Sequence, residues 1–326
     1  MQQVRCEQIR HSYDGVRDAV SELTLSIRAG EVLALIGPNG AGKSTTLRIL
    51  ATLQRPDAGQ VQWDGSDAWQ ERFAIRRRIG FLGDGTALYP TMTAAGYLRF
   101  FAECYGQDDA KAAKRVDEVL RMFDLQGKAD VAISELSKGM RQRLAIARTL
   151  IHDPELLLLD EPADGLDPLA RRQLRNVLRK VADSGVGIVV SSHILRELDG
   201  FCDTVALIQK GRLEVHGTVE EVIANYEVGR RLHEVHVTRG LQKAIEVLKK
   251  HEGLIEAVLP LHKGEVIGDP TTADRGMLRV RIHGEEDRAA HLLRELVLAD
   301  VDVISLAKVR SDLEDVYQSM GRDEVS

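Results

Sequence analysis

One uninterrupted string, Gly37 to Thr45, constrains this chain more than any other feature of its sequence. It reads Gly-Pro-Asn-Gly-Ala-Gly-Lys-Ser-Thr, follows the apolar run Val32–Ile36 and precedes residues 46–53, whose leucines and isoleucine recur at helical spacing. A glycine loop between a buried strand and a helix directs backbone N–H groups at an anion, and the positive end of the helix adds to that field. The alternative is an ordinary glycine-rich turn. The ungapped match in this context favours a phosphate-binding loop.

Within such a loop, Lys43 reaches the β- and γ-phosphates and the Ser44 hydroxyl ligates Mg²⁺. A second motif, residues 155–162, consists of four leucines in a row closed by two acids, which is typical of a strand buried on both faces of a parallel sheet. Ligands bind at the carboxyl end of such strands, so Asp160 is placed to hold Mg²⁺ through water and Glu161 to orient or deprotonate an attacking water. The alternative is a pair of solvated acids at a strand end.

Two further segments offer polar groups at the ends of elements. His193 follows the buried strand 186–190 and is placed to hydrogen-bond a γ-phosphate, although a lone histidine is more often structural. Residues 136–140 read Leu-Ser-Lys-Gly-Met and begin an amphipathic helix, so Ser137 and Gly139 can present a hydroxyl and N–H groups to an anion. Taken alone, a plain helix N-cap at Ser137 is the better interpretation.

Composition limits the classes of protein open to this chain. With 326 residues it is long enough for two domains. Its net charge of −6 gives no overall basic surface for nucleic acid or anionic lipid, although a local basic patch remains compatible with that value. We expect no membrane span and no signal peptide, because no apolar run approaches the length of about 20 residues that a span requires. Three distant cysteines, Cys6, Cys104 and Cys202, indicate neither a disulfide framework nor a zinc site, which points to the cytoplasm.

The remaining pattern predicts two folding units. Before the loop, residues 2–30 predict antiparallel strands, and residues 93–133 predict a helical insert between core strands. From about Leu232, strands and helices follow in the order β-α-β-β-α-β with a last helix from Leu313, which indicates a small split βαβ domain. The unit, including its loop at 268–272, has no motif to which chemistry can be assigned. His233 and His236 are three apart on a strand and so face opposite sides, which favours solvated surface over a metal site.

The ordered set of motifs resembles the ATP-binding subunit of ABC transporters over roughly residues 3–225. Gly37 to Ser44 is similar to the Walker A loop, Leu136 to Met140 to the signature sequence, Ala163 to Asp167 to the D-loop and His193 to the switch histidine, while Asp160 and Glu161 resemble the Walker B acids. The resemblance also places Tyr13 where an aromatic ring stacks on adenine. It implies the following nucleotide contacts: Tyr13, Gly37, Pro38, Asn39, Gly40, Ala41, Gly42, Lys43, Ser44, Thr45, Asp84, Ser137, Lys138, Gly139 and Asp167. It further implies catalytic roles for Lys43, Glu161 and His193, and Mg²⁺ ligands from Ser44, Asp160 and Asp84.

Three positions depart from the family pattern. The signature has Lys138 and Met140 where the commoner form has glycine and glutamine. Asp84 stands where the family has its Q-loop glutamine, and a carboxylate can ligate Mg²⁺ but cannot donate a hydrogen bond as an amide does. The D-loop begins with Ala163-Asp164 in place of the usual small polar residue. With the C-terminal domain, these features are similar to the bacterial exporter branch that includes drug-resistance and sodium-extrusion ATPases.

From this resemblance we expect an α/β P-loop NTPase fold: an ABC ATPase core with a mixed sheet, an antiparallel β subdomain and a helical insert, plus a small α+β C-terminal domain. The expected bounds are 1–225 for the ATP-binding domain with its insert at about 90–135, 226–231 for a linker, 232–321 for the accessory domain and 322–326 for a tail. The implied ligands are ATP and Mg²⁺.

The implied partners are a second copy of the chain and a polytopic permease on a separate chain, with no nucleic acid. The protein would then lie at the cytoplasmic face of the membrane and power export of a drug, an ion or a lipid, and the family likeness makes residues 93–106 the candidate permease contact. One alternative is a soluble ABC-type ATPase that acts on ribosomes or nucleic acid. Another is a nucleotide-dependent regulator whose C-terminal domain binds a small effector.

Overall fold

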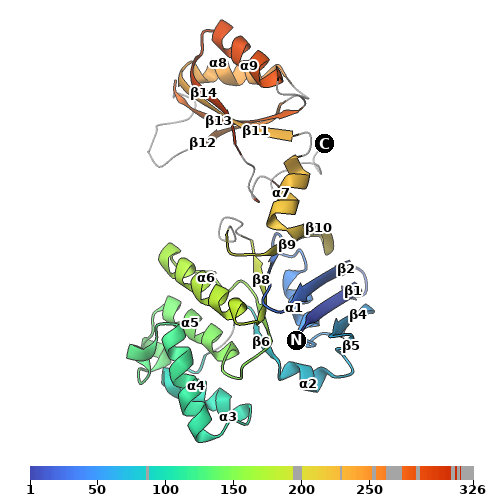
Figure 1. Cartoon of the computed structure of the whole chain (residues 1–326), viewed down its shortest axis with the longest axis vertical. Coiled ribbons are helices and arrows are strands. Elements are labelled where there is room, and N and C mark those ends of the chain that lie inside the picture. Colours follow the sequence, from blue (N-terminus) through green and yellow to red (C-terminus); the bar gives the residue numbers. More distant parts are fainter. Residues whose placement is uncertain are drawn as a thin grey trace. The chain divides into compact units, whose positions relative to one another are not determined.

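The computed structural model describes residues 1–85, 88–193, 200–227, 230–251, 255–261, 274–283, 287–309, 313 and 316 (Figure 1). The chain divides into two compact units, Met1–Val219 and Glu220–Ser326. This division precedes the expected boundary at residue 225. The segment expected as a linker at 226–231 holds the end of helix α7 (Val219–Glu227) and the start of strand β11 (Arg230–Arg239) instead. Two acids in the first turn of α7, Glu220 and Glu221, favour the start of this helix. The expected linker did not take this signal into account.

The first unit begins with an antiparallel sheet. Its strands are arranged in the order β2-β1-β4-β5. Their bounds are β1 Gln3–Ser12, β2 Asp18–Arg28, β4 Ala58–Trp63 and β5 Ser66–Asp67. Along β1, buried Val4 and Cys6 alternate with exposed neighbours, so one face of this sheet packs against the core and the other faces solvent. The predicted antiparallel strands before the phosphate loop are confirmed.

The central sheet of this unit has the strand order β10-β9-β3-β8-β7-β6. The strands span β3 Val32–Ile36, β6 Ile79–Leu82, β7 Leu156–Leu159, β8 Gly187–Ser192, β9 Thr204–Gln209 and β10 Arg212–Thr218. Every pair is parallel except β9 and β10. Strands β3, β7 and β8 are buried along their whole length, which explains the unbroken apolar sequences of β3 and β7 and the apolar run of β8 before its two serines. Because these strands are adjacent and parallel, the residues that follow each of them meet at one sheet edge.

Helices surround this sheet and form the insert. They span α1 Lys43–Leu50, α2 Arg72–Arg76, α3 Ala94–Cys104, α4 Asp109–Met122, α5 Lys138–Thr149 and α6 Pro168–Asp183, with short 3₁₀ turns at Gln126–Lys128 and Ile133–Glu135. Side chains of Thr93 and Asp108 cap α3 and α4 by accepting backbone N–H groups. Figure 1 shows α3 and α4 beside α5, as predicted for the insert. Of the described helices, none is long and apolar enough to cross a membrane.

The second unit confirms the predicted β-α-β-β-α-β order. After β11 come α8 Leu241–Lys249, β12 Ile255–Leu261, β13 Gly276–His283, α9 Asp287–Leu298 and β14 Asp302–Lys308. The sheet is antiparallel with the order β12-β13-β11-β14. Its core contains Val235, Leu248, Leu278 and Leu296. The loop 268–272 and most of the last predicted helix lie outside the described residues.

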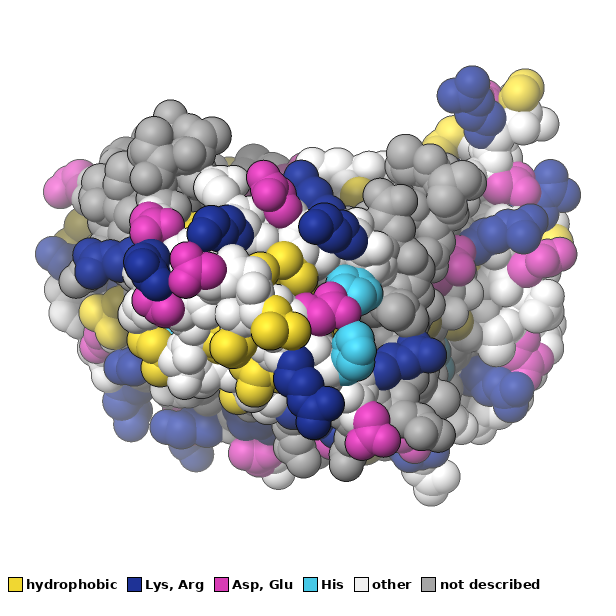
Figure 2. Space-filling view, turned by 90° about the horizontal axis from the view of Figure 1, so that it is seen from above, with side chains coloured by type: hydrophobic (Ala, Val, Ile, Leu, Met, Phe, Trp, Pro, Cys, Tyr) yellow, Lys and Arg dark blue, Asp and Glu magenta, His cyan; other side chains and the backbone are white. Residues whose placement is uncertain are grey.

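One prediction for this unit is wrong. His236 is exposed as expected, but His233 is buried, because it shares a strand face with the core residues Val235 and Val237. Two further histidines of the unit adjoin one acid: the Glu295 carboxylate contacts His251 and lies 3.1 Å from His291 Nδ1. Histidine side chains next to an acidic one are visible on the face drawn in Figure 2.

Candidate functional site

The phosphate loop requires glycine at two points for steric reasons. A Cβ on Gly42 would lie 2.4 Å from the Ala19 carbonyl oxygen, and one on Gly37 would lie 2.3 Å from the Ile208 carbonyl oxygen. Gly42 also has φ of 105°, a backbone conformation that other residues rarely adopt. The loop therefore turns tightly against β2 and β9 before α1 begins at Lys43.

Lys43 is held inside this loop. Its Nζ donates to the carbonyl oxygens of Gly37 at 2.7 Å and Pro38 at 3.2 Å, and it lies 3.3 Å from Glu161 Oε1. The side chain is 6% exposed. Lys43, Ser44 and Thr45 form the first turn of α1, where unpaired N–H groups and the helix dipole favour an anion.

The carboxyl ends of β7 and β8 are joined by a serine that the sequence motifs did not identify. Ser191 Oγ donates to Asp160 Oδ1 at 2.7 Å and accepts the backbone N–H of Glu161 at 2.8 Å. Ser191 is fully buried and Asp160 is 4% exposed. Glu161 itself has φ of 45°, which is uncommon for a residue other than glycine. One hydroxyl thus fixes both acids, and the only sequence signal for it was a polar pair following an apolar strand.

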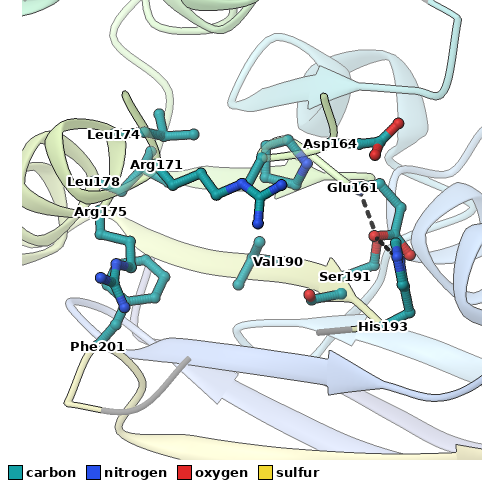
Figure 3. Close-up of a pocket in the computed structure, with 13 residues that line it drawn as sticks. Glu161, Asp164, Arg171, Leu174, Arg175, Leu178, Val190, Ser191, His193 and Phe201 are labelled. Atoms are coloured by element: carbon teal, nitrogen blue, oxygen red, sulfur yellow. Dashed lines mark hydrogen bonds and ion pairs between the residues drawn. The ribbon is translucent and has the colours of Figure 1, made fainter. Parts of the chain in front are cut away.

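Glu161 lies between two cationic or cation-forming side chains. Its Oε2 is 2.9 Å from His193 Nδ1, while Oε1 is turned toward Lys43 without accepting a hydrogen bond from it. Figure 3 shows Glu161, Ser191 and His193 together at one end of a pocket. The rest of that pocket is lined by apolar residues of α6 and β8, such as Leu178 and Val190, and by the charged side chains of Arg171 and Arg175. The three residues predicted to be catalytic are therefore brought together, and Oε1 is a buried acceptor left open to a ligand or water.

Tyr13 lies next to the first turn of α1. Its hydroxyl is 3.2 Å from Thr45 Oγ1, and its ring meets that of His11 edge-on with centroids 4.9 Å apart. The Tyr13 side chain is nevertheless 60% exposed. It therefore offers an anchored aromatic ring with accessible surface beside the phosphate loop.

The signature segment is organised around the start of α5. Ser137 is the N-cap of α5 and accepts the Met140 N–H at 3.2 Å. Lys138 lies against Gly165, where a Cβ would be 2.0 Å from Lys138 Nζ. Within the described part of this chain, no hydrogen bond or ion pair connects residues 137–139 to the phosphate loop.

The other two predicted contacts are placed as follows. Asp167 is the N-cap of α6, and its Oδ1 accepts the Ala170 N–H at 2.9 Å, so this side chain has a structural partner within its own chain. Asp84 is exposed and follows β6, whose last residue, Leu82, accepts the Asp160 N–H at 2.8 Å. Asp84 thus follows the strand that neighbours β7. Among the described residues, no hydrogen bond or ion pair joins the Asp84 side chain to Asp160.

Comparison with known proteins agrees with this geometry. The ABC transporter family model matches residues 20–164. The daunorubicin resistance ATP-binding protein DrrA3 of Streptomyces coeruleorubidus is 32% identical over 310 residues, which cover 95% of this chain and 93% of the relative. The chain belongs to the ATP-binding subunits of ABC transporters. The bacitracin transport ATP-binding protein BcrA of Bacillus licheniformis is likewise 32% identical over 306 residues, covering 93% and 92% of the two chains.

Solved ABC cassettes share the fold of the first unit. A structure of the ATP-binding subunit of an ABC transporter has a TM-score of 0.63 at 30% identity and covers 70% of this chain and 94% of its own. A dimeric bacterial ABC transporter cassette has a TM-score of 0.61 at 28% identity, covering 66% and 98%. The predicted α/β ABC ATPase fold is confirmed, and with it an ATPase cassette.

Proposed function

We propose that two copies of this chain bind ATP and Mg²⁺ between their cassettes and hydrolyse the ATP to power export through a separate membrane permease. ATP hydrolysis follows from the family. The export role is supported by relatives whose names describe daunorubicin resistance and bacitracin transport. The structural observation that carries the proposal is the convergence of Lys43, Glu161 and His193 at one sheet edge. In the portion of the chain that the structure describes, the signature segment makes no hydrogen bond or ion pair to these three side chains.

The donors at this edge suit phosphate and a hard cation. Lys43 and the N–H groups of the first turn of α1 are placed for the phosphate oxygens, and Ser44 and Asp160 offer a hydroxyl and a carboxylate oxygen. Mg²⁺, when bound, neutralises charge on the phosphates. We assign Ser44 and Asp160 to it, with Asp84 as a further candidate ligand from the neighbouring strand end.

Glu161 is the residue best placed to accept a proton from water. Its two carboxylate oxygens are divided between Lys43 and His193, so a nucleotide that draws Lys43 toward its phosphates leaves Oε1 free for a water molecule. His193 keeps the other oxygen oriented. This assignment needs no movement of the Glu161 backbone, whose N–H Ser191 accepts, or of the Asp160 carboxylate, to which Ser191 donates.

The second copy supplies what one chain lacks. Ser137 and Gly139 lie at the start of α5, where the N–H groups of the first turn suit an anion. In the described ranges of the chain, no hydrogen bond or ion pair joins this helix start to the phosphate loop of the same chain. A head-to-tail pair would place this helix start against the γ-phosphate of the other copy. ATP then joins the two faces and hydrolysis separates them, so nucleotide biases a two-state assembly. The dimeric cassette among the solved relatives supports this arrangement.

We place the permease contact at a groove beside the insert. It is lined by Phe101 of α3 and Tyr105, the residue that ends this helix, together with Phe81 of β6, Arg148 and His152. The rings of Tyr105 and His152 are stacked with centroids 3.8 Å apart, which makes the groove wall rigid. The groove follows the strand that leads to Asp84, so a permease segment seated there would adjoin the nucleotide site. We infer that the protein works at the cytoplasmic face of the membrane.

Affinity purification tests the export assignment. The tagged protein, isolated from detergent-solubilised membranes, should bring down a polytopic membrane protein, and the variant Tyr105→Asp should not. Recovery of ribosomes or DNA in place of a membrane protein would contradict the export role while leaving the ATPase assignment intact.

A further inference from the structure

A cluster of arginines and apolar side chains covers helix α2 and the loop before β4. We call it the arginine–aromatic patch, and it consists of Leu53, Arg55, Trp69, Arg72, Phe73, Arg76 and Arg77. The Arg72 guanidinium lies 4.7 Å from the centroid of the Phe73 ring and 5.4 Å from that of Trp69. Arg76 and Arg55 lie over the same two rings at 5.7 and 5.8 Å. Arg77 follows Phe73 by four residues and so shares its side of the helix.

The charge of this patch is not neutralised within the described part of the chain. Arg55, Arg72, Arg76 and Arg77 have no ion pair there, whereas Arg78, next in sequence, is paired with Glu155 at 2.7 Å. Arg72 and Arg76 do donate to backbone carbonyl oxygens of Trp69 and Thr52, but these contacts orient the guanidinium groups without cancelling their charge. The four arginines outnumber the neighbouring carboxylates of Asp57, Asp67 and Glu71, so the patch is locally positive in a protein with a net charge of −6.

The patch also exposes apolar surface. Phe73 is 68% exposed and Leu53 is 49% exposed, each beside an arginine. Cationic side chains around exposed aromatic and aliphatic groups suit a membrane interface, where the rings enter the headgroup region and the arginines meet phosphate. The net charge of −6 disfavours a long polyanion such as nucleic acid, which would extend beyond the patch onto the acidic remainder of the surface. The observations therefore favour a lipid surface.

The position of the patch agrees with this partner. Arg76 and Leu53 line the same groove as Phe101 and Tyr105, so the patch continues from the groove that we propose for the permease. A permease lies in the bilayer, and the surface next to its contact is thus the one that faces the headgroups. This placement rests on the proposed function, whereas lipid binding itself can be measured without any permease.

We propose that the arginine–aromatic patch binds the anionic phospholipid headgroups of the membrane beside the permease, with Phe73 entering the interface. Each arginine near an anionic surface contributes roughly fivefold to the partition coefficient, and the contribution falls with ionic strength. Together these contacts are too weak for irreversible anchoring. They bias the orientation of a cassette that its permease already holds.

Co-sedimentation of the full chain with phospholipid vesicles tests the proposal. We expect binding to vesicles containing phosphatidylglycerol, little binding to pure phosphatidylcholine, and loss of binding as salt is raised. The double variant Arg72→Ala, Arg77→Ala should lower the partition coefficient roughly 25-fold, about fivefold for each charge. Single Arg77→Ala, which removes an exposed side chain, should lower it about fivefold and guards against a folding defect.

A matched control removes two exposed cations of α6. The variant Arg172→Ala, Lys180→Ala has the same net charge as the double patch variant and should bind vesicles within twofold of the unaltered protein. Phosphate buffer and chloride buffer of equal ionic strength should lower vesicle binding to the same extent, because the patch recognises a charged interface and not a single anion. Three results would overturn the proposal. They are an equal loss of vesicle binding in the α6 control variant, equal binding to both vesicle types, and selective displacement of the protein from vesicles by RNA. Permease co-purification is a separate readout, so its failure would not be confused with these results.

Discussion

Replacing Ser191 with alanine removes the one hydroxyl that contacts both acids of the nucleotide site. The change removes the 2.7 Å hydrogen bond to Asp160 Oδ1. It also removes the acceptor of the Glu161 N–H, which in the unaltered protein lies 2.8 Å away. A hydrogen bond to a charged group is worth about 1.5–3 kcal/mol, and an unsatisfied buried donor costs about 1–3 kcal/mol. Because Ser191 is fully buried, water does not replace it easily. The Glu161 N–H is only partly buried, so we expect the free energy of unfolding to fall by roughly 2.5–4 kcal/mol, the lower part of the summed range.

The effect on catalysis should exceed the effect on binding. Glu161 holds an unfavourable backbone conformation with φ of 45°, and without Ser191 its carboxylate is free to leave the position between Lys43 and His193. We expect kcat for ATP to fall roughly 10- to 100-fold, equivalent to about 1.4–2.7 kcal/mol, with the Kd for ATP measured without Mg²⁺ changed less than threefold. Asp160 loses its orienting partner as well, so the Mg²⁺ concentration for half-maximal activity should rise.

The assay combines steady-state ATPase kinetics, fluorescent-nucleotide titration and urea unfolding. Ser191→Thr retains a hydroxyl on a strand, where β-branched residues are favoured, and should recover most of the activity. Ser184→Ala removes a serine hydroxyl that donates to the Val181 carbonyl oxygen at the end of α6 and should leave kcat unchanged. Unchanged kcat and unchanged unfolding in Ser191→Ala would refute the role that the geometry assigns to this hydroxyl.

Three further outcomes follow from the structure. Gly42→Ala should abolish nucleotide binding, because its Cβ would lie 2.4 Å from a carbonyl oxygen. Gly40→Ala, whose Cβ would have nothing within 4 Å, should retain binding and lower the free energy of unfolding by only about 1 kcal/mol. Similar nucleotide titrations for the two variants would contradict this. Lys43→Ala should weaken ATP binding at least tenfold, and unchanged affinity would exclude the phosphate role. Hydrogen bonding from Arg78 lowers the pKa of Glu155 to about 2 from its ordinary value of 4.5, so its contribution to stability is present above pH 4.5 and is lost as pH falls toward 2. Glu155→Gln should remove that part of the pH dependence of urea unfolding, by about 1 kcal/mol or less at this partly exposed site.

The first unit was largely predictable because its motifs are local. A glycine loop between a buried strand and a helix specifies its own backbone, and four consecutive leucines before two acids specify a parallel strand and its carboxyl end. Adjacent parallel strands then bring Lys43, Glu161 and His193 together without further information. The β-α-β-β-α-β order was equally readable, since each of its elements has its own periodicity.

Features that depend on tertiary contact were not predictable in this way. Ser191 is an ordinary strand residue until β7 and β8 are paired. The burial of His233 follows from the strand face that it shares with Val235 and Val237, which the spacing to His236 alone did not reveal. Asp167 was expected to contact nucleotide; its capping of α6 is a local feature, and Asp167 directly before Pro168 is a sequence signal for it. The arginines around Phe73 have no motif in the sequence, and only the fold shows that, among the described residues, they form no ion pair with a carboxylate.

The central claim is that the nucleotide site is completed by a second copy, and subunit mixing tests it most directly. Lys43→Ala disables the phosphate loop and retains Ser137, whereas Ser137→Glu retains the loop and places a carboxylate against the γ-phosphate. Each variant alone should be inactive. If the site is shared across a two-fold axis, random pairing yields mixed dimers with one intact site, and the mixture should recover about a quarter of the unaltered activity. Differential tags on the two variants show whether mixed dimers form. If they do form and the ATPase activity of the mixture stays at the average of the two inactive variants, each chain builds its site alone.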